Sequence, residues 1–359
     1  MKKLVAIIML LAMMVSVVGC SAPAEEAVQP EVSDDQPAVE EVPEELEKFV
    51  IGVSYQGPNN DWATNFLAHF EKEFEAHADQ IEKVIYKEYG WDGEQQLADI
   101  EDLMVQGIDA LVVAPHNDTG LVSIVEDVYD AGIPVICFNT APGTDKYTAL
   151  IMSDNERDGY ETATWLCDRL NGEGNVIIIE GAPGSRYAED VAAGYNRAIE
   201  EHPGVKLLGY EYAYWTAATA KQIIESYIAK GEKIDGVLCS GLTGVGVVEA
   251  FVDAGLDIPP ITAGDGSTGF IRKALEVGYT DFGAIITNNF EYASGAIDLT
   301  FKVLNGEEYQ KDTFVESNPA ISGQELIDMY SEDMPAQYWI GGTVASEEFE
   351  SYLTPAFSK

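Results

Sequence analysis

Histidine and cysteine are scarce in this sequence, and neither occurs in the spacing of a catalytic or metal site. The 359 residues include four histidines and four cysteines. There is no His-Glu-x-x-His motif, Cys-x-x-Cys pair or recognisable nucleophile motif, which argues against zinc-hydrolase and triad chemistry. The cysteines after Cys20 form an odd, widely separated set, so we expect Cys137, Cys167 and Cys239 to be free, buried thiols. The sequence predicts a protein that is not an enzyme and has no cofactor and no metal.

Basic residues are also few. The chain has 20 Lys and Arg against 62 Asp and Glu, for a net charge of -42. Phosphate backbones and anionic membranes repel such a surface, which argues against a nucleic-acid partner. Apolar residues make up 46% of the chain and aromatics 10%, enough for substantial cores, and the length allows two domains of ordinary size.

The apolar stretch at the N-terminus, Leu4–Val18, is too short to span a membrane comfortably. Lys2 and Lys3 precede it, as is typical of a cleaved export signal. Residues 17–20, VVGC, also resemble the lipobox of bacterial lipoproteins, in which a cysteine thiol carries the lipid. This resemblance predicts that Cys20 is the lipidated mature N-terminus, and a cleaved signal with an incidental cysteine is the alternative.

Two N-terminal segments are therefore expected ahead of the folded part. Residues 1–20 form the lipoprotein signal peptide, and residues 21–48, which contain ten Asp and Glu and no periodicity, form a disordered acidic tether. Lipidation would place the protein on the extracytoplasmic face of the membrane of a bacterium, and we expect a monoderm cell.

From residue 49 onward, apolar runs alternate with helical periodicity. This alternation predicts an α/β fold built from βαβ units, with parallel sheets and helices on both faces. It continues beyond one domain's length, so we expect two halves of similar size. The expected strands are 49–53, 84–86, 110–114, 135–138, 149–152, 176–180, 205–212, 237–240, 261–263 and 283–287, with short ones at 314–315 and 338–344.

The first expected strand ends on Asn59, Asn60, Asp61 and Trp62, which place polar groups beside a large apolar face. Open α/β sheets bind their ligands at the carboxyl ends of the strands, so this stretch is typical of a ligand site. It also suits an ordinary loop in which Asn or Asp caps the next helix and the Trp packs in a core. The stretch alone leaves both interpretations open.

Several stretches in register resemble one known family. The chain resembles the type I extracytoplasmic solute-binding proteins of ABC transporters, the group that includes ribose-binding and glucose/galactose-binding proteins. The match covers roughly residues 49–310. The stretches are VSYQGPNNDW, QGIDALVVAP, AGIPVICFNT, MSDNERDG, EGAPGSRYAE, YWTAATA, VEAFVDAGL, ITAGDGS and AIITNN.

The resemblance implies two lobes, each built on a doubly wound parallel sheet. The chain would cross three times from one lobe to the other through a hinge, and one small ligand would bind in the cleft between the lobes. It places residues 49–152 plus 289–312 in an N-terminal lobe and residues 153–288 plus 313–359 in a C-terminal lobe. The lobes would close around the ligand by a hinge motion.

The resemblance also assigns ligand contacts by position. Trp62 and Trp215, one from each lobe, would sandwich the apolar faces of a sugar ring, and polar side chains would bind the hydroxyl groups at its edge. Asp61 stays open between a helix cap and a ligand contact. The predicted ligand-binding residues are Asn60, Asp61, Trp62, Asn139, Trp215, Ser240, Asp265 and Asn288.

The sequence departs from the family where relatives carry cationic residues. The arginine expected after the Gly-rich loop of the second lobe is replaced by Glu189, Asp190 and Val191, and Thr140 follows Asn139 where relatives have arginine. Arg186 is either a substitute or a solvated loop residue. The cleft should be less cationic than is usual, so a polyol, a modified sugar or a basic ligand drawn by acidic residues remains open beside a common aldose.

The predicted function is that of a lipid-anchored, monomeric receptor that binds a small sugar or polyol and delivers it to an ABC permease. A ligand-sensing receptor for a membrane signalling protein, or a binder of a nucleoside or basic solute, is the alternative. The glycines 241, 244 and 246 lack the spacing of a dinucleotide site and favour tight packing of a strand against a helix. His116 follows the carboxyl end of an expected strand and is interpreted as an exposed loop histidine, with a ligand contact as the alternative.

Overall fold

The computed structural model describes residues 47–263, 265–284, 289–316 and 319–358. The predicted lipidation site Cys20 and the predicted ligand contact Asn288 lie outside these residues, as do the expected signal peptide and most of the expected tether. None of the helices in the described ranges is long and apolar enough to cross a membrane.

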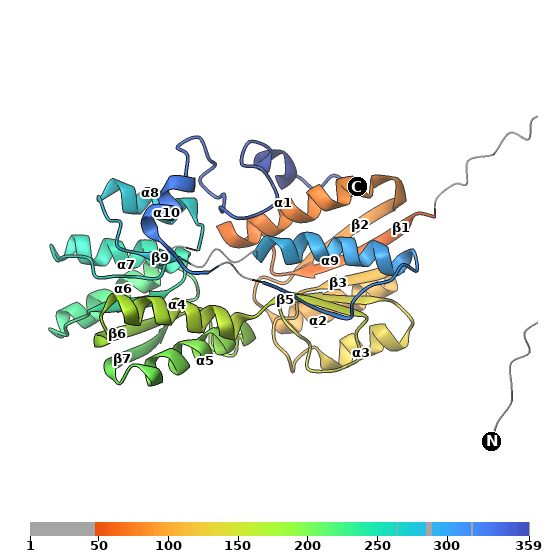
Figure 1. The fold of residues 1–359 in the computed structure, drawn as a ribbon. Helices are drawn as coiled ribbons and strands as arrows, with labels where there is room; N and C mark the ends of the chain where they lie inside the picture. Colours follow the sequence, from red (N-terminus) through yellow and green to blue (C-terminus); the bar gives the residue numbers. More distant parts are fainter. Residues whose placement is uncertain (1–46, 264, 285–288, 317–318, 359) are drawn as a thin grey trace, which may run out of the picture. The chain divides into compact units, whose positions relative to one another are not determined.

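A six-stranded parallel sheet forms the centre of what we call the first lobe (Figure 1). Its strands lie in the order β10-β5-β4-β3-β1-β2. Helices α1 and α9 pack on one face of this sheet, and α2 and α3 on the other. The elements are β1 (Phe49–Tyr55), α1 (Asp61–Ala76), η1 (Ala78–Gln80), β2 (Ile81–Glu88), α2 (Gly93–Val105), β3 (Ala110–Val113), α3 (Val122–Asp130), β4 (Val135–Phe138), β5 (Ala149–Ser153), α9 (Asn289–Leu304) and β10 (Asp312–Val315).

Strand β3 shows why these strands have unbroken apolar runs. Val112 packs in the core with the aromatic residues of α1 and α9, whereas Leu111 and Val113 pack in the core beneath α2 and α3. Successive side chains of a strand point to opposite faces, so a strand covered on both sides must be apolar at every position. This pattern accounts for the predicted α/β class.

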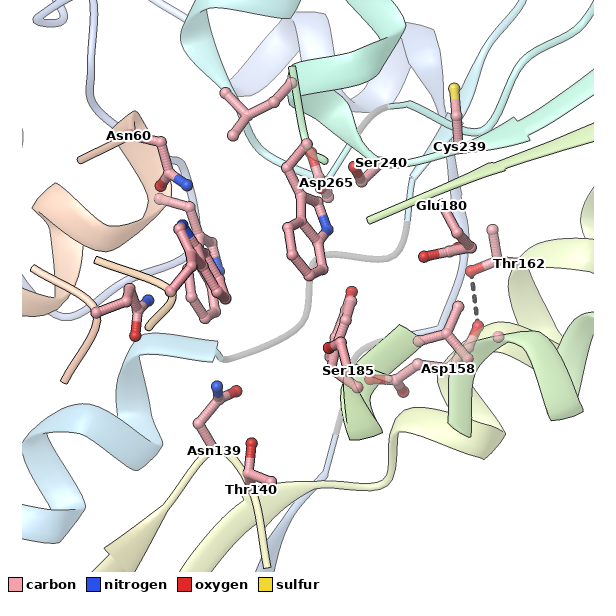
Figure 2. Close-up of a pocket in the computed structure, with 18 of the residues that line it drawn as sticks. Asn60, Asn139, Thr140, Asp158, Thr162, Glu180, Ser185, Cys239, Ser240 and Asp265 are labelled. Atoms are coloured by element: carbon pink, nitrogen blue, oxygen red, sulfur yellow. Dashed lines mark hydrogen bonds between the residues drawn. The ribbon is translucent and has the colours of Figure 1, made fainter. Parts of the chain in front are cut away.

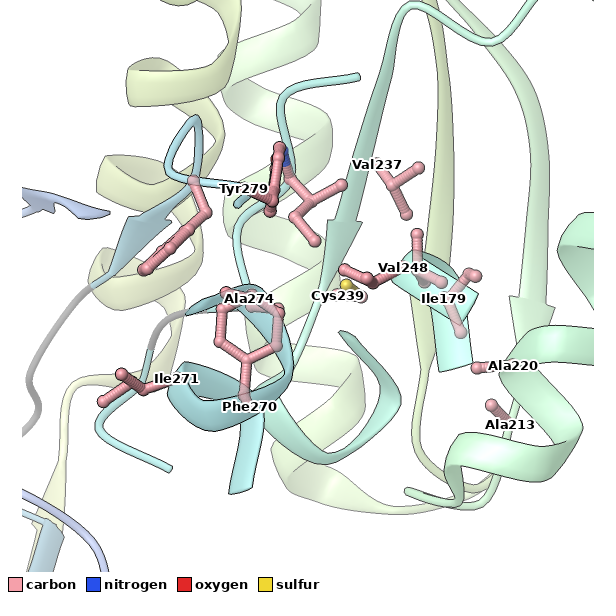
Figure 3. Packing of buried hydrophobic residues seen from close by; sticks show 14 of the residues in the cluster. Ile179, Ala213, Ala220, Val237, Cys239, Val248, Phe270, Ile271, Ala274 and Tyr279 are labelled. Atoms are coloured by element: carbon pink, nitrogen blue, oxygen red, sulfur yellow. The ribbon is translucent and has the colours of Figure 1, made fainter. Parts of the chain in front are cut away.

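The second lobe is built around a smaller parallel sheet with the order β7-β6-β8. Isolated bridges continue it from Val237 through Ile261 to Phe282. Helices α4 and α5 cover one face, and α6, α7 and α8 cover the other, where Phe270 and Ala274 of α8 join the core in Figure 3. The elements are α4 (Asn155–Arg169), β6 (Glu173–Glu180), α5 (Arg186–Glu201), β7 (Gly204–Tyr212), α6 (Ala217–Ala229), β8 (Gly236–Cys239), α7 (Gly241–Asp253) and α8 (Thr268–Glu276).

The glycine cluster at the start of α7 serves helix packing, as predicted. A Cβ atom on Gly244 would lie 2.1 Å from Cβ of Ala263, and one on Gly246 would lie 1.9 Å from the carbonyl oxygen of Ala217. Both distances are too short for any side chain, so α7 can approach its neighbours only with glycine there. The prediction of free, buried thiols at the three described cysteines is also confirmed.

The last part of the chain contacts both lobes, which differs from the expected placement of residues 313–359 in the second lobe. Strand β10 pairs with β5 of the first sheet, and Trp339 and Phe357 pack in the first-lobe core. The remaining elements are β9 (Gly283–Ala284), β11 (Ile321–Ser322), α10 (Gly323–Met329) and η2 (Phe349–Leu353). The expected strand 338–344 forms only an isolated bridge between Trp339 and Ser267.

His69 of α1 fixes this C-terminal segment to the first lobe. Its Nδ1 lies 2.7 Å from the carbonyl oxygen of Asn65, and its Nε2 accepts from the backbone N–H groups of Thr343 at 3.0 Å and Val344 at 3.3 Å. An acceptor at Nε2 requires a neutral ring with the proton on Nδ1. Burial of the ring lowers the pKa of His69 to about 4, in agreement with that assignment.

Candidate ligand-binding cleft

One pocket is lined by residues of both lobes, at the carboxyl ends of strands in each (Figure 2). Its cavity volume is about 110 Å³. A cavity needs roughly 10–15 Å³ to hold one water molecule, so the pocket has room for several waters or one small molecule. Ligands of open α/β sheets bind at this edge because the loops there diverge. The position agrees with the cleft that the sequence analysis expected.

The structure brings most of the predicted ligand-binding residues together in this pocket. Six of them line it: Asn60, Trp62, Asn139, Trp215, Ser240 and Asp265. Asp61 does not line it, and Asn288 lies outside the described residues. Each ligand contact stays a prediction, but these six side chains share one cavity although they are spread over about two hundred residues of sequence.

Asn60 combines the two roles that the sequence left open. Its Oδ1 accepts the backbone N–H of Ala63 at 2.8 Å, so it is the N-cap of α1, and the residue also lines the pocket. Asp61 is the first residue of the helix, where a carboxylate is favourable beside the exposed N–H groups. Its partial burial raises its pKa. Of the two, the structure places only Asn60 against the cavity.

The aromatic residues of the pocket are arranged differently from the expected pair of plates. Trp215 stacks on Trp91 with ring centroids 5.0 Å apart and an interplanar angle of 21°. Trp62 instead packs edge-to-face against Phe66 at 4.3 Å. Trp91 follows strand β2, and the sequence analysis missed it because the resemblance did not include that loop. A Trp after a strand end, flanked by Gly90, was the available signal.

Backbone strain is concentrated at this site. Five described residues other than glycine have φ in the left-handed region, and three of them line the pocket: Trp91 at 73°, Asn139 at 64° and Trp215 at 52°. Such conformations cost on the order of 1 kcal/mol or more and persist where the surrounding structure enforces them, often at ligand sites.

Gly181 makes room for one of these side chains. A Cβ atom at this position would lie 1.9 Å from the indole of Trp215. The loop is held by the N–H of Tyr214, which donates to the carbonyl oxygen of Gly181 at 2.8 Å. Trp215 therefore lies flat against bare backbone at the end of β6, and this is a close approach that only glycine allows.

Buried polar atoms without a partner gather in the pocket. Among the described residues six side-chain atoms are in this state, and four of them belong to pocket residues: Gln56 Nε2, His116 Nδ1, Asp265 Oδ1 and Trp339 Nε1. Buried polar atoms are normally hydrogen-bonded, so a group of orphaned donors and acceptors around one cavity indicates partners supplied by a ligand.

Two of these residues correct or extend the sequence analysis. His116 is not an exposed loop histidine: it is partly buried against the cavity, and burial lowers its pKa while Asp92 opposes that shift. Trp339 comes from the C-terminal segment, whose weak pattern gave no signal of a site. Its backbone N–H lies 3.3 Å from Oδ1 of Asn65, which positions it near the cavity.

Three carboxylates line the second-lobe side: Asp158, Glu180 and Asp265. Burial raises the pKa of Glu180 to about 8, although hydrogen bonds from the Gly181 N–H and the Tyr195 hydroxyl oppose this shift. Burial likewise raises the pKa of Asp265 to about 7, opposed by the Gly241 N–H at 3.0 Å from Oδ2. Desolvation outweighs the hydrogen bonds at both groups.

No Lys or Arg occurs among the described residues that line the pocket. Arg186 lies outside it: its guanidinium contacts Asp190 at 2.8 Å and Asp118 of the first lobe at 3.5 Å. It is therefore a partly exposed ion-pair residue and does not replace the arginine of relatives. Val191 lines the pocket near the place where that arginine was expected.

Most of the chain matches one family of known proteins. The periplasmic binding protein domain family matches residues 51–308. The xylitol-binding protein of Mycolicibacterium smegmatis is 27% identical over 240 residues, covering 66% of this chain and 68% of that protein. The ribose import binding protein RbsB of Bacillus subtilis is 25% identical over 259 residues, covering 72% and 80%.

Solved structures show the same fold. A solute-binding protein of an ABC transporter from Bacillus halodurans C-125, with bound myo-inositol, superposes with a TM-score of 0.71 at 24% identity, covering 80% of this chain and 98% of that chain. Another from Thermobispora bispora gives 0.74 at 22% identity, covering 85% and 94%. The α/β fold and the resemblance that the sequence carried are both confirmed.

Proposed function

The chain belongs to the periplasmic binding protein domain family, whose members are extracytoplasmic binding proteins rather than enzymes, and on that basis we propose that it binds a small sugar or polyol. The observation that carries the proposal is the group of orphaned polar atoms around one cavity that both lobes line. Relatives named for xylitol, ribose and galactofuranose support the same class of ligand.

The chemistry of the pocket fits a polyhydroxylated ring. Indole faces can pack on the C–H groups of a sugar, while amide, hydroxyl and carboxylate groups bind hydroxyls that both donate and accept. We assign apolar contacts with the ring to Trp62 and Trp215, which both line the pocket although Trp215 stacks on Trp91, and the polar edge to the other lining residues predicted from the sequence, which are Asn60, Asn139, Ser240 and Asp265. Asn288 remains a predicted contact.

The proposed role is delivery of this solute to an ABC permease by a monomer that is anchored through a lipid on Cys20. Ligand that contacts both lobes is bound more strongly in the closed form, so binding shifts the population toward closure. A permease can recognise that closed form. The family and its transporter relatives support this role, and the lipobox-like VVGC sequence supports the anchor.

The Trp62→Ala, Trp215→Ala double variant tests the site. We expect xylitol, D-ribose, D-xylose, myo-inositol and their amino-substituted counterparts to include at least one compound that raises the Tm of the wild-type protein by a few degrees. A ligand at a hundred times its Kd adds about 2.7 kcal/mol to the free energy of unfolding. The double variant should show no such rise, because both apolar faces of the site are gone.

Tyr214→Ala provides the matched control. Tyr214 is adjacent to Trp215 but 58% exposed, and it does not line the pocket. It should keep the full thermal shift. An unchanged ligand-dependent shift in the double variant would place the ligand elsewhere and contradict the proposed site.

A further inference from the structure

The acidic side of the pocket is the feature that a neutral sugar explains least. Asp158 comes from α4, Glu180 from the end of β6 and Asp265 from the segment between α7 and α8, so three separate parts of the chain each bring a carboxyl group to one cavity. In Figure 2 they lie on the side opposite Asn60 and Asn139. Burial raises the pKa of the Tyr187 phenol, and the negative charge of all three carboxylates raises it further.

The described lining contains no Lys or Arg that could pair with Glu180 or Asp265, and burial lowers the pKa of His116. Arg186, the nearest candidate in sequence, already contacts Asp190 and Asp118 outside the cavity. Isolated carboxylates are costly to bury and are normally paired with a positive group. A ligand that offers only hydroxyl groups supplies no counter-charge, so Glu180 and Asp265 could ionise beside it only at a high desolvation cost.

Buried polar atoms without a hydrogen-bond partner lie in the same pocket as these acidic residues, which indicates a ligand site. Gln56 and Trp339 are 2% and 3% exposed, and each has a donor in the pocket without a partner. Oδ1 of Asp265 is a buried acceptor without a partner, whereas Oδ2 accepts from Gly241. An ammonium group carries three donors and one positive charge, so it satisfies both the orphaned acceptor and the charge.

We propose that the solute carries an amino group, as in an amino sugar or an amino cyclitol, and that Glu180 and Asp265 receive its ammonium. This inference rests on the proposed function and names the ligand class within it. The hydroxyl groups of the ring would then face the amide and indole groups of the first lobe, and the amine would face the second.

The titration of the pocket supports this assignment. With pKa values of about 8 for Glu180 and about 7 for Asp265, both raised by burial, the pocket without a bound cation holds protons near neutral pH. The titratable groups around them on the second lobe are Asp158, Tyr187, Tyr195, Tyr210 and Cys239, and Tyr89 and His116 line the cavity from the first lobe. Of these only His116 can become a cation, and burial lowers its pKa. A bound ammonium favours the ionised carboxylates, so its binding releases protons.

Isothermal titration calorimetry with matched ligands tests the inference. D-glucosamine, D-galactosamine and an inosamine are compared with D-glucose, D-galactose and myo-inositol, which replace the amine by a hydroxyl. N-acetyl-D-glucosamine keeps the nitrogen without its charge. At least one amine should bind ten times more tightly than its hydroxyl and acetylated counterparts, and its affinity should rise between pH 6 and pH 8. Its binding enthalpy should differ between phosphate and Tris buffers because protons are released.

Substitution of Glu180 and of Asp265 tests whether their negative charge is what favours the amine over its hydroxyl counterpart. Glu180→Gln and Asp265→Asn keep the shape of each side chain and remove its charge, so each should weaken binding of the amine at least tenfold and weaken it at least threefold more than binding of the hydroxyl counterpart. Glu189→Gln is the control, because Glu189 is exposed and outside the pocket. A melting curve without ligand confirms that each variant folds.

The outcomes separate this inference from the proposed function. If a hydroxyl compound binds as tightly as its amine, or if the variants weaken binding of both equally, the proposal of an amino group is wrong and sugar binding still stands. The carboxyl groups would then act as hydrogen-bonding groups only. If none of the amines and none of their hydroxyl or acetylated counterparts binds, both the proposed function and this inference are wrong.

Discussion

The two walls of the cleft differ in chemistry although both are built from strand ends of the same kind of sheet. The first lobe contributes amides, indoles and a histidine, including Gln56, Trp91 and His116, whereas the second contributes the three carboxyl groups and two tyrosines, one buried and one partly buried. The topology of each lobe therefore places polar loops at the cleft, and the particular side chains decide what each wall recognises. One wall is neutral and donates hydrogen bonds, and the other is acidic.

The walls also depend on different parts of the chain. Trp339 reaches the first wall from the C-terminal segment, which is held at His69, while Trp215 reaches the second wall because Gly181 leaves room for it. One change of pH and two substitutions test how each wall depends on these residues, and they are given from the largest expected effect to the smallest.

The largest effect is expected from protonation of His69. Its pKa is about 4 in the folded protein and 6.5 as the ordinary value, so the unfolded chain binds the extra proton between these values. The contribution of this group to stability is complete above about pH 6.5 and is lost as the pH falls toward 4, by up to about 3 kcal/mol. Urea unfolding of the wild type and of His69→Gln across this range measures it. Parallel pH profiles for the two proteins would show that the ring does not titrate as inferred.

Gly181→Ala tests the second wall alone. The added Cβ would overlap the indole of Trp215, so this ring must move, and the loss of its contact should weaken ligand binding by roughly ten- to a hundredfold. The free energy of unfolding should change much less than the affinity. Calorimetry with the best ligand gives the first quantity and urea unfolding the second. Gly184→Ala is a control in the same loop, with open space around the added Cβ but φ of +77°; equal loss of affinity in both variants would point to loop strain instead.

Trp91→Ala should have the smallest effect. It removes the stacking of Trp91 on Trp215, which joins the two walls, and aromatic pairs of this kind contribute about 0.5–1.5 kcal/mol beyond buried area. The expected loss is about two- to tenfold in affinity, with faster ligand release because the closed form is less favoured. Stopped-flow fluorescence measures the release rate. An unchanged rate would mean that the stack does not contribute to holding the lobes closed.

Many residues that line the cleft could be predicted from the sequence because they lie just after the ends of strands. Asn139, Ser240 and Trp215 each come directly or shortly after an apolar run, and parallel strands bring such positions to one edge. Trp91 was missed although it meets the same criterion, since only the loops matched by the resemblance were considered. Asp61 was left open between a helix cap and a ligand contact; it is the first residue of α1 and does not line the pocket.

Hydrophobic periodicity and strand-end chemistry are local properties, so the α/β class, the two halves and the sheet edge at which the pocket lies could all be predicted from the sequence. Only the tertiary structure decided which residues share the cavity. Trp339 arrives from a segment without a clear pattern, Trp215 pairs with Trp91, and Arg186 is taken up by ion pairs outside. The raised pKa values of Glu180 and Asp265 come from desolvation, which depends on every element packed around the carboxylates and so is set by the fold as a whole.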